Sequence, residues 1–80
     1  KMNNSTILIV DDEPQIQKML TITLESVGYR VVVAGTGKEA LQMVASHPPE
    51  LVLLDLGLPD LNGHEVLRHL REWFTGPIII

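Results

Sequence analysis

The sequence predicts an α/β fold in which a parallel sheet is doubly wound, with helices on both of its faces. Short apolar runs rich in β-branched residues alternate along the chain with segments whose apolar residues recur every three or four positions. Such runs are typical of parallel strands covered on both faces, and strands that alternate with helices imply right-handed crossovers. A chain of 80 residues, of which 45% are hydrophobic and 20% charged, is long enough for one small domain.

The predicted strands are four short runs, which read TILIV, RVVVA, LVLL and PIII and span 6–10, 30–34, 51–54 and 77–80. We expect both faces of these strands to be buried. Because the chain stops within the fourth run, we expect an incomplete sheet in the order βαβαβαβ with a bare apolar edge strand. A piece of this kind is expected to self-associate through that edge.

The first predicted helix spans 14–27, with Pro14 in its first turn and Gly28 just past its end. Its expected core face consists of Ile16, Leu20, Thr23, Leu24 and Val27. Beside this face lies a shoulder that we expect to be exposed, formed by Gln15, Met19 and Ile22.

The second and third predicted helices span 37–46 and about 63–74. Thr36 and Glu39 have the spacing of a capping box at the start of the second helix. The expected core stripes are Ala40, Leu41, Val44 and Ala45 in the second helix, and Val66, Leu67, Leu70 and Trp73 in the third.

Composition excludes several classes of function. The 10 acidic residues outnumber the 6 basic ones, and the formal net charge of −4 argues against a general nucleic-acid-binding surface. Without cysteine the chain has no disulfide, thiolate metal site or iron–sulfur cluster, which allows an intracellular, cytoplasmic location. The longest apolar runs are far too short to span a bilayer, so no membrane association is expected.

Acidic residues follow two of the predicted strands. Asp11 and Asp12 end the first strand and Asp55 ends the third. In a flavodoxin-like sheet with the strand order 2-1-3-4 these strands are neighbours, and their carboxyl ends meet where ligands bind. Three carboxylates converging there would repel one another unless a divalent cation is bound. Oxygen ligands alone favour Mg²⁺, with Mn²⁺ as a substitute.

Each of these acids has a simpler interpretation as well. A single Asp after a strand is more often a turn former or a helix cap than a functional residue. Capping does not account for an adjacent pair on one strand together with a third acid on its expected neighbour. The loop after Asp55 contains Gly57, Pro59 and Gly63, which are typical of an ordinary turn between a strand and a helix. Such a turn does not explain the acid at position 55.

These motifs resemble the receiver domains of two-component response regulators. The resemblance is carried by ILIVDDEP at 7–14, DLGLPDLNG at 55–63, Gly28 and the order of elements, and it covers essentially all of residues 1–80. Within the family the sequence is most similar to the OmpR/PhoB class and, within that class, resembles its KdpE-type members. The resemblance implies a flavodoxin-like (CheY-like) fold, of which this chain holds the N-terminal part, without the last strand and the last two helices.

The resemblance also implies roles for individual residues. Asp55 matches the aspartate that accepts a phosphoryl group from a sensor histidine kinase, while Asp11, Asp12 and the backbone carbonyl of Gly57 match the other Mg²⁺ ligands. Many relatives carry a larger residue in place of Gly57. The first helix matches the kinase-docking surface, which makes Gln15, Met19 and Ile22 expected partner contacts. The output is expected to be transcription, through a DNA-binding domain outside this chain.

The alternatives to a phospho-accepting receiver belong to other classes. Mg²⁺-dependent phosphatases with an aspartyl nucleophile carry Asp-x-Asp on the first strand, whereas this strand ends in adjacent acids. A flavodoxin-like cofactor module needs a phosphate loop rich in Gly, Ser or Thr, and this loop is acidic. A degenerate receiver that acts only through protein contacts is disfavoured by the intact set of acids. We therefore expect a regulated phospho-acceptor and not a turnover enzyme.

Overall fold

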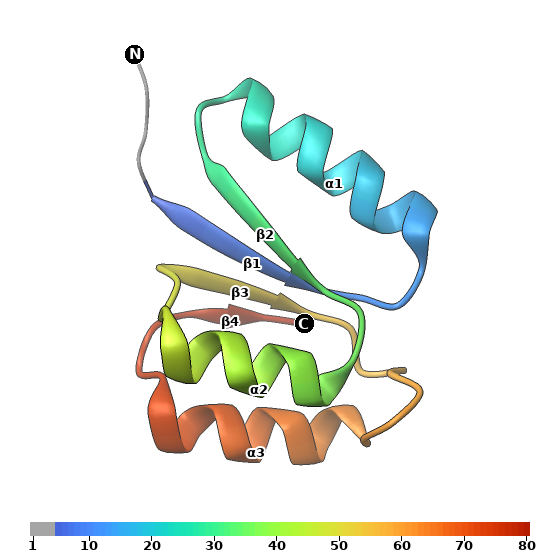
Figure 1. The fold of residues 1–80 in the computed structure, drawn as a ribbon, viewed down its shortest axis with the longest axis vertical. Coiled ribbons are helices and arrows are strands. Elements are labelled where there is room, and N and C mark those ends of the chain that lie inside the picture. The colour runs from blue at the N-terminus through green and yellow to red at the C-terminus, as the bar shows by residue number, and fades with distance from the viewer. Residues whose placement is uncertain (1–4) are drawn as a thin grey trace.

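The computed structural model describes residues 5–80, which fold into four strands and three helices in the order βαβαβαβ (Figure 1). The strands are β1 (Thr6–Val10), β2 (Arg30–Ala34), β3 (Leu51–Leu54) and β4 (Ile78–Ile79). The helices are α1 (Pro14–Ser26), α2 (Gly37–Ser46) and α3 (Gly63–Trp73). Among the described residues, none of these helices is both long and apolar enough to cross a membrane.

The strands form one parallel sheet in the order β2-β1-β3-β4, which confirms the predicted flavodoxin-like topology. Val10, at the end of β1, pairs with Ala34 of β2 on one side and with Leu54 of β3 on the other. In Figure 1, α2 and α3 lie together along one side of the sheet and α1 lies apart from them, beside β2. The ends of β1 and β3 are therefore brought side by side.

The main core lies between the sheet and the pair of helices α2 and α3. Alternate residues of the central strands point into it, and Leu8, Val10 and Val52 are completely buried. The helices add Val44, Val66 and Leu70, among others. Burial of several large aliphatic side chains, each worth about 1.5–3 kcal/mol, anchors the end of β3 that leads into Asp55.

Burial of both faces, which the apolar runs predict, is found only in β1 among the four strands of the described region. In β2 the predicted burial is wrong for one face, since Val32 is 37% exposed at the edge of the sheet. In β3, Leu53 is only partly buried because α1 covers the β2 side of its face. The fourth strand is shorter than predicted, and its Ile79 is 54% exposed at the other edge.

Four predicted core positions in the helices are also wrong. Val27 is 62% exposed, because α1 ends at Ser26 and Gly28 then turns the chain with a positive φ of 98°. Trp73 is 65% exposed, and the adjacent Phe74, which caps α3, is buried in its place. Thr23 and Ala45 are exposed as well. Val27, Ala45 and Trp73 lie in the last turn of a helix or just past it, whereas Thr23 lies within α1 on the flank of its partly buried face. Self-association through β4 stays a prediction.

Candidate metal centre

The carboxyl ends of β1 and β3 hold the acidic residues in place through backbone hydrogen bonds. The N–H of Asp55 donates to the carbonyl oxygen of Val10 at 2.9 Å, and the N–H of Asp11 donates to that of Ala34 at 3.1 Å. Both acids therefore continue the ladder of the sheet for one residue beyond the strands. Their backbones are as well fixed as the strands themselves, and only the side chains extend past the edge.

Asp11, Asp12 and Asp55 come together at this edge. Each offers one carboxylate oxygen, and these oxygens all lie within 4.8 Å of one another. Asp11 and Asp55 are partly buried and Asp12 is exposed. Within residues 5–80 no lysine or arginine forms an ion pair with any of them. Three uncompensated carboxylates at this spacing form a donor set that suits a hard divalent cation such as Mg²⁺.

The side chain of Asp55 is held by the loop that follows it. Its Oδ1 accepts a hydrogen bond from the N–H of Gly57 at 3.0 Å. In the part of the chain that the structure describes, Oδ2 has no donor. Gly57 is exposed, and a Cβ atom at this position would lie 3.6 Å from Oδ1, which is ordinary contact. One oxygen of Asp55 is thus oriented, while the other remains available for chemistry.

Asp11 is fixed by the start of α1. Its Oδ1 accepts the N–H of Glu13 at 2.8 Å, and its backbone carbonyl oxygen accepts a hydrogen bond from the side-chain amide of Gln17. We did not predict a role for Gln17, because the sequence shows it only as a polar residue about one turn into the helix. Its contact with Asp11 depends on how α1 leaves the strand.

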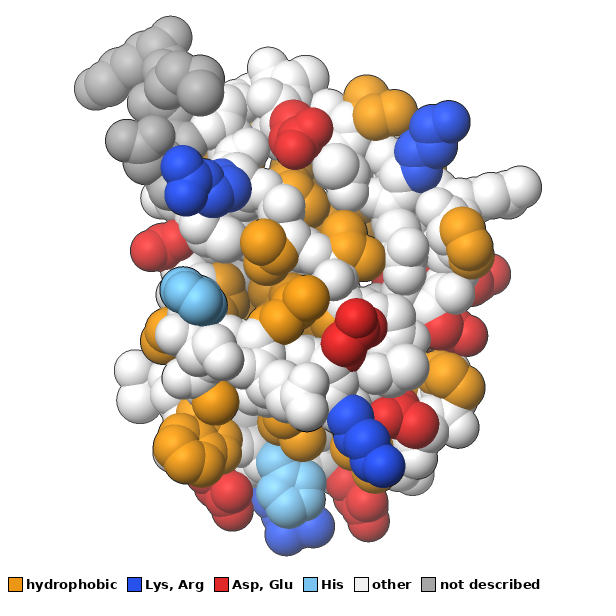
Figure 2. All heavy atoms as spheres, in the orientation of Figure 1, with side chains coloured by type: hydrophobic (Ala, Val, Ile, Leu, Met, Phe, Trp, Pro, Cys, Tyr) orange, Lys and Arg blue, Asp and Glu red, His pale blue; other side chains and the backbone are white. Residues whose placement is uncertain are grey.

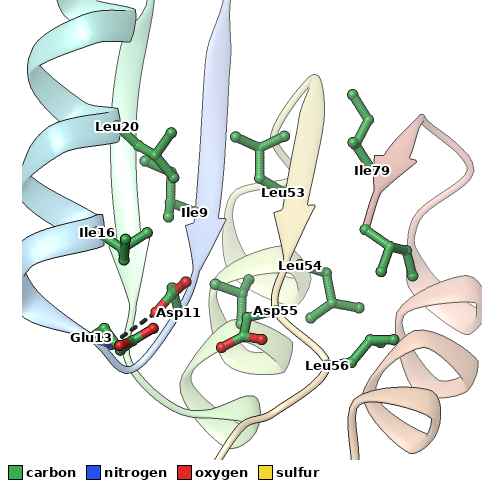
Figure 3. A pocket seen from close by; sticks show the side chains of 12 residues that line it. Ile9, Asp11, Glu13, Ile16, Leu20, Leu53, Leu54, Asp55, Leu56 and Ile79 are labelled. Carbon is green, nitrogen blue, oxygen red and sulfur yellow. Dashed lines mark hydrogen bonds between the residues drawn. The ribbon is translucent and has the colours of Figure 1, made fainter.

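The carboxylates lie at one end of a hollow on the face of the sheet that α1 partly covers (Figure 3). Figure 3 shows Asp11 and Asp55 side by side at the ends of their strands, with apolar side chains from β1, β3, β4 and α1 further along the hollow. These include Ile9, Leu20, Leu53 and Ile79.

The loop between β3 and α3 contacts α2 as well as the acidic site. The carboxylate of Asp60 accepts the N–H groups of Gly37 and Lys38 at 2.8 and 3.1 Å, and these bonds, that of Gly37 foremost, hold the pKa of Asp60 below its usual value. We did not predict this contact. Pro59 before it indicates only a turn, and only the folded topology brings that turn to α2.

The predicted capping box of α2 is half correct. Thr36 Oγ1 accepts the N–H of Glu39 at 3.1 Å, as expected. The carboxylate of Glu39, however, accepts the N–H of Gly35 at 2.8 Å and not that of Thr36. The bond therefore closes the turn before the helix, next to the end of β2.

The predicted partner residues are exposed on α1 and do not line the acidic hollow. Gln15, Met19 and Ile22 face solvent on α1, and the last two are 54% and 58% exposed.

The face of the molecule that holds α2 and α3 carries both acidic and basic side chains (Figure 2). In the view of Figure 2, acidic and basic side chains are interspersed over α2 and α3.

Comparison with known proteins identifies the class to which this fold and acidic edge belong. The family model of the response regulator receiver domain matches residues 7–80. The chain belongs to this family.

Similar sequences include regulators of the OmpR/PhoB class, as predicted. The chain is 53% identical over 74 residues to the transcriptional regulatory protein KdpE of Mycobacterium tuberculosis. The aligned region covers 92% of this chain and 33% of the relative. The chain is 43% identical over 76 residues to the KDP operon regulator KdpE of Escherichia coli K12, covering 95% of this chain and 34% of the relative. The chain thus spans about a third of the length of these relatives.

Solved structures agree with the assignment. The N-terminal domain of a response regulator receiver protein from Methanoculleus marisnigri JR1 superposes with a TM-score of 0.83 at 35% identity, covering 95% of this chain and 64% of that one. The response regulator TrrA of Thermotoga maritima, solved in complex with Mg²⁺-BeF, gives 0.81 at 40% identity and covers 85% and 59%.

Proposed function

We propose that this chain accepts a phosphoryl group on Asp55, with Mg²⁺ held by Asp11, Asp12, Asp55 and the backbone carbonyl of Gly57. The observation that carries the proposal is the convergence of the three carboxylates within 4.8 Å at the ends of adjacent strands, without a basic partner in the described residues. Membership of the receiver family supports the same reading. Mn²⁺ has the same preference for oxygen ligands and is an expected substitute.

In the proposed transfer, the unpartnered carboxylate oxygen of Asp55 attacks phosphorus. A new P–O bond gives an acyl phosphate while the P–N bond to a kinase histidine breaks, and the electron pair of that bond stays on the imidazole nitrogen. The Gly57 N–H orients the other oxygen of Asp55. When bound, Mg²⁺ neutralises charge on the transferring group. Asp11 and Asp12 supply the negative charge that holds the cation beside the acceptor.

This function is regulatory, so we do not regard the chain as a turnover enzyme. Its relatives are named as transcriptional regulators. By analogy we propose a sensor histidine kinase as the phosphoryl donor, a cytoplasmic location, and control of transcription through a DNA-binding output domain outside this chain. Neither a phosphatase-like enzyme nor a degenerate receiver is favoured by a specific contact among the described residues.

The direct test is phosphorylation of the intact protein by a small phosphodonor such as acetyl phosphate. We expect a mass gain of one phosphoryl group that requires Mg²⁺, since nothing else in the described residues compensates the three carboxylates. Intact mass spectrometry with and without a chelator measures this gain. Equal phosphorylation after complete removal of divalent cations would contradict the proposal, as would a phosphoryl group mapped to a residue other than Asp55.

A second prediction concerns docking of the kinase on α1. Met19 and Ile22 are exposed apolar side chains on the helix that starts beside the acidic site, and we expect Met19→Glu together with Ile22→Glu to slow kinase-dependent phosphorylation by roughly tenfold or more. Phosphorylation by acetyl phosphate should be unchanged, because the acidic site is untouched. Gln15→Glu tests the edge of the same surface. An unaltered kinase rate in the folded double variant would remove this surface from the proposal.

A further inference from the structure

The first turn of α2 is capped in part by a residue from another segment of the chain. The N–H groups of Gly37, Lys38 and Glu39 have no partner inside the helix. Thr36, the local cap, accepts only that of Glu39, at 3.1 Å. Asp60 accepts the other two, at 2.8 Å from Gly37 and 3.1 Å from Lys38. The helix start therefore depends on a carboxylate in the loop between β3 and α3.

The contact between this loop and α2 is close. A Cβ atom on Gly37 would lie 2.8 Å from Val66 Cγ2 and 3.0 Å from Leu61 Cδ1, so the first residue of α2 packs directly against the end of the loop and α3. Gly37 is buried as a result. The same hydrogen bonds, that of Gly37 foremost, lower the pKa of Asp60, because the N–H groups favour the charged carboxylate.

The same loop carries Asp55 and Gly57. Its base is closed by a hydrogen bond from the N–H of Gly63 to the carbonyl oxygen of Leu56 at 3.2 Å. Leu58, beside Gly57, is 8% exposed and belongs to the core. Asp60 is the polar attachment of the loop to α2, on the far side of Leu58 from Gly57. Without it the loop is held at its base and by the apolar contacts of Leu58 and Leu61, and among the described residues no other hydrogen bond ties it to α2.

We propose that Asp60 is a positioning residue for the ion site, because it ties the β3–α3 loop to the first turn of α2 and so holds Gly57 in the arrangement that binds Mg²⁺. This inference rests on the proposed function and adds to it a coupling between the ion site and α2. Coupling of this kind is reciprocal, so an ion that fixes the loop also strengthens the capping of α2.

The first test is the affinity of the intact protein for Mg²⁺ alone, measured by isothermal titration calorimetry. We expect Asp60→Ala to weaken binding by roughly fivefold, the lower end of the usual range for coupling between sites. Asp60→Asn should lie between, since its single carbonyl oxygen can accept only part of the pair of bonds. Glu25→Gln, which makes the same change of net charge near the far end of α1, is the matched control and should leave the affinity unchanged.

The second test uses the unsubstituted protein and reports on the coupling itself. Amide hydrogen exchange at Gly37 and Lys38 should slow when Mg²⁺ is added, and this response should be reduced in Asp60→Asn and disappear in Asp60→Ala. A cap with a purely structural role would lower protection of α2 and leave both the Mg²⁺ affinity and this response unaltered, which overturns the inference alone. Failure of the unsubstituted protein to bind Mg²⁺ would overturn the proposed function, and this inference with it.

Discussion

Asp55→Asn should abolish phosphorylation, reducing the rate with acetyl phosphate by at least about a thousandfold, since loss of a nucleophile typically costs more than this. An amide oxygen is a poor nucleophile and carries no charge to hold a cation. The fold should persist, because the asparagine oxygen can still accept the N–H of Gly57, which donates to Asp55 at 3.0 Å. The measurement is the fraction of protein that gains one phosphoryl mass, beside a urea unfolding curve.

Glu13→Gln is the matched control for this prediction. Glu13 lines the same hollow as Asp55, and its side chain makes no capping bond at the start of α1. The substitution removes one negative charge near the site without removing a member of the acidic group. It should leave phosphorylation within a few-fold of the unsubstituted rate. Equal losses in both variants would mean that charge in the hollow, and not Asp55 as acceptor, governs the reaction.

Gly63→Ala should be the most damaging small substitution in the loop. A Cβ atom at Gly63 would lie 2.3 Å from Leu56 Cα and 2.6 Å from the Leu56 carbonyl oxygen, so backbone must move to admit it. Overpacking of this kind costs about 3 kcal/mol of unfolding free energy or more. Leu56 lies between Asp55 and Gly57, so its movement also displaces these two proposed ligands. Mg²⁺ binding should therefore weaken in the folded fraction. Urea denaturation measures the loss of stability.

Gly57→Ala is the same chemical change in the same loop and should be tolerated. Its new Cβ atom would make only an ordinary 3.6 Å contact with Asp55 Oδ1. Neither Gly57 nor Gly63 has a positive φ, so backbone strain does not separate the two variants. We expect its unfolding free energy to stay within about 0.5 kcal/mol of the unsubstituted value. Similar destabilisation of both would show that the close approach of Gly63 to Leu56 is not the limiting contact.

Much of the fold could be predicted because it depends on short-range patterns. The runs at 6–10, 30–34 and 51–54 became β1, β2 and β3 with the predicted bounds, and Gly28 ends α1 as its position suggests. The pairing of β1 with β3 could be predicted from the expected strand order. This pairing brings Asp11 and Asp55 together.

Burial was harder to predict, because it depends on what lies beside a segment. Val32 is an apolar, β-branched residue but occupies an edge strand. Trp73 continues a helical stripe to the last residue of α3, where the chain turns and Phe74 enters the core instead. The roles of Gln17 and Asp60 were missed for a related reason. Each bonds to backbone atoms of another segment, and backbone atoms leave no mark in the sequence.

The order in which the chain is connected has a kinetic consequence. Asp11 and Asp12 lie at the end of β1, whereas Asp55 arrives only after α1, β2 and α2 have been traversed. Pairing of β1 with β3 closes a long loop, and contacts between residues far apart in the sequence tend to form slowly, since the entropy of the loop is lost before the strands pair. If Asp55 is the phosphoryl acceptor, as we propose, a chain in which β1 and β3 have not paired would lack the assembled site. Only folded molecules would then accept the phosphoryl group, so completion of the tertiary fold would be a condition for signalling.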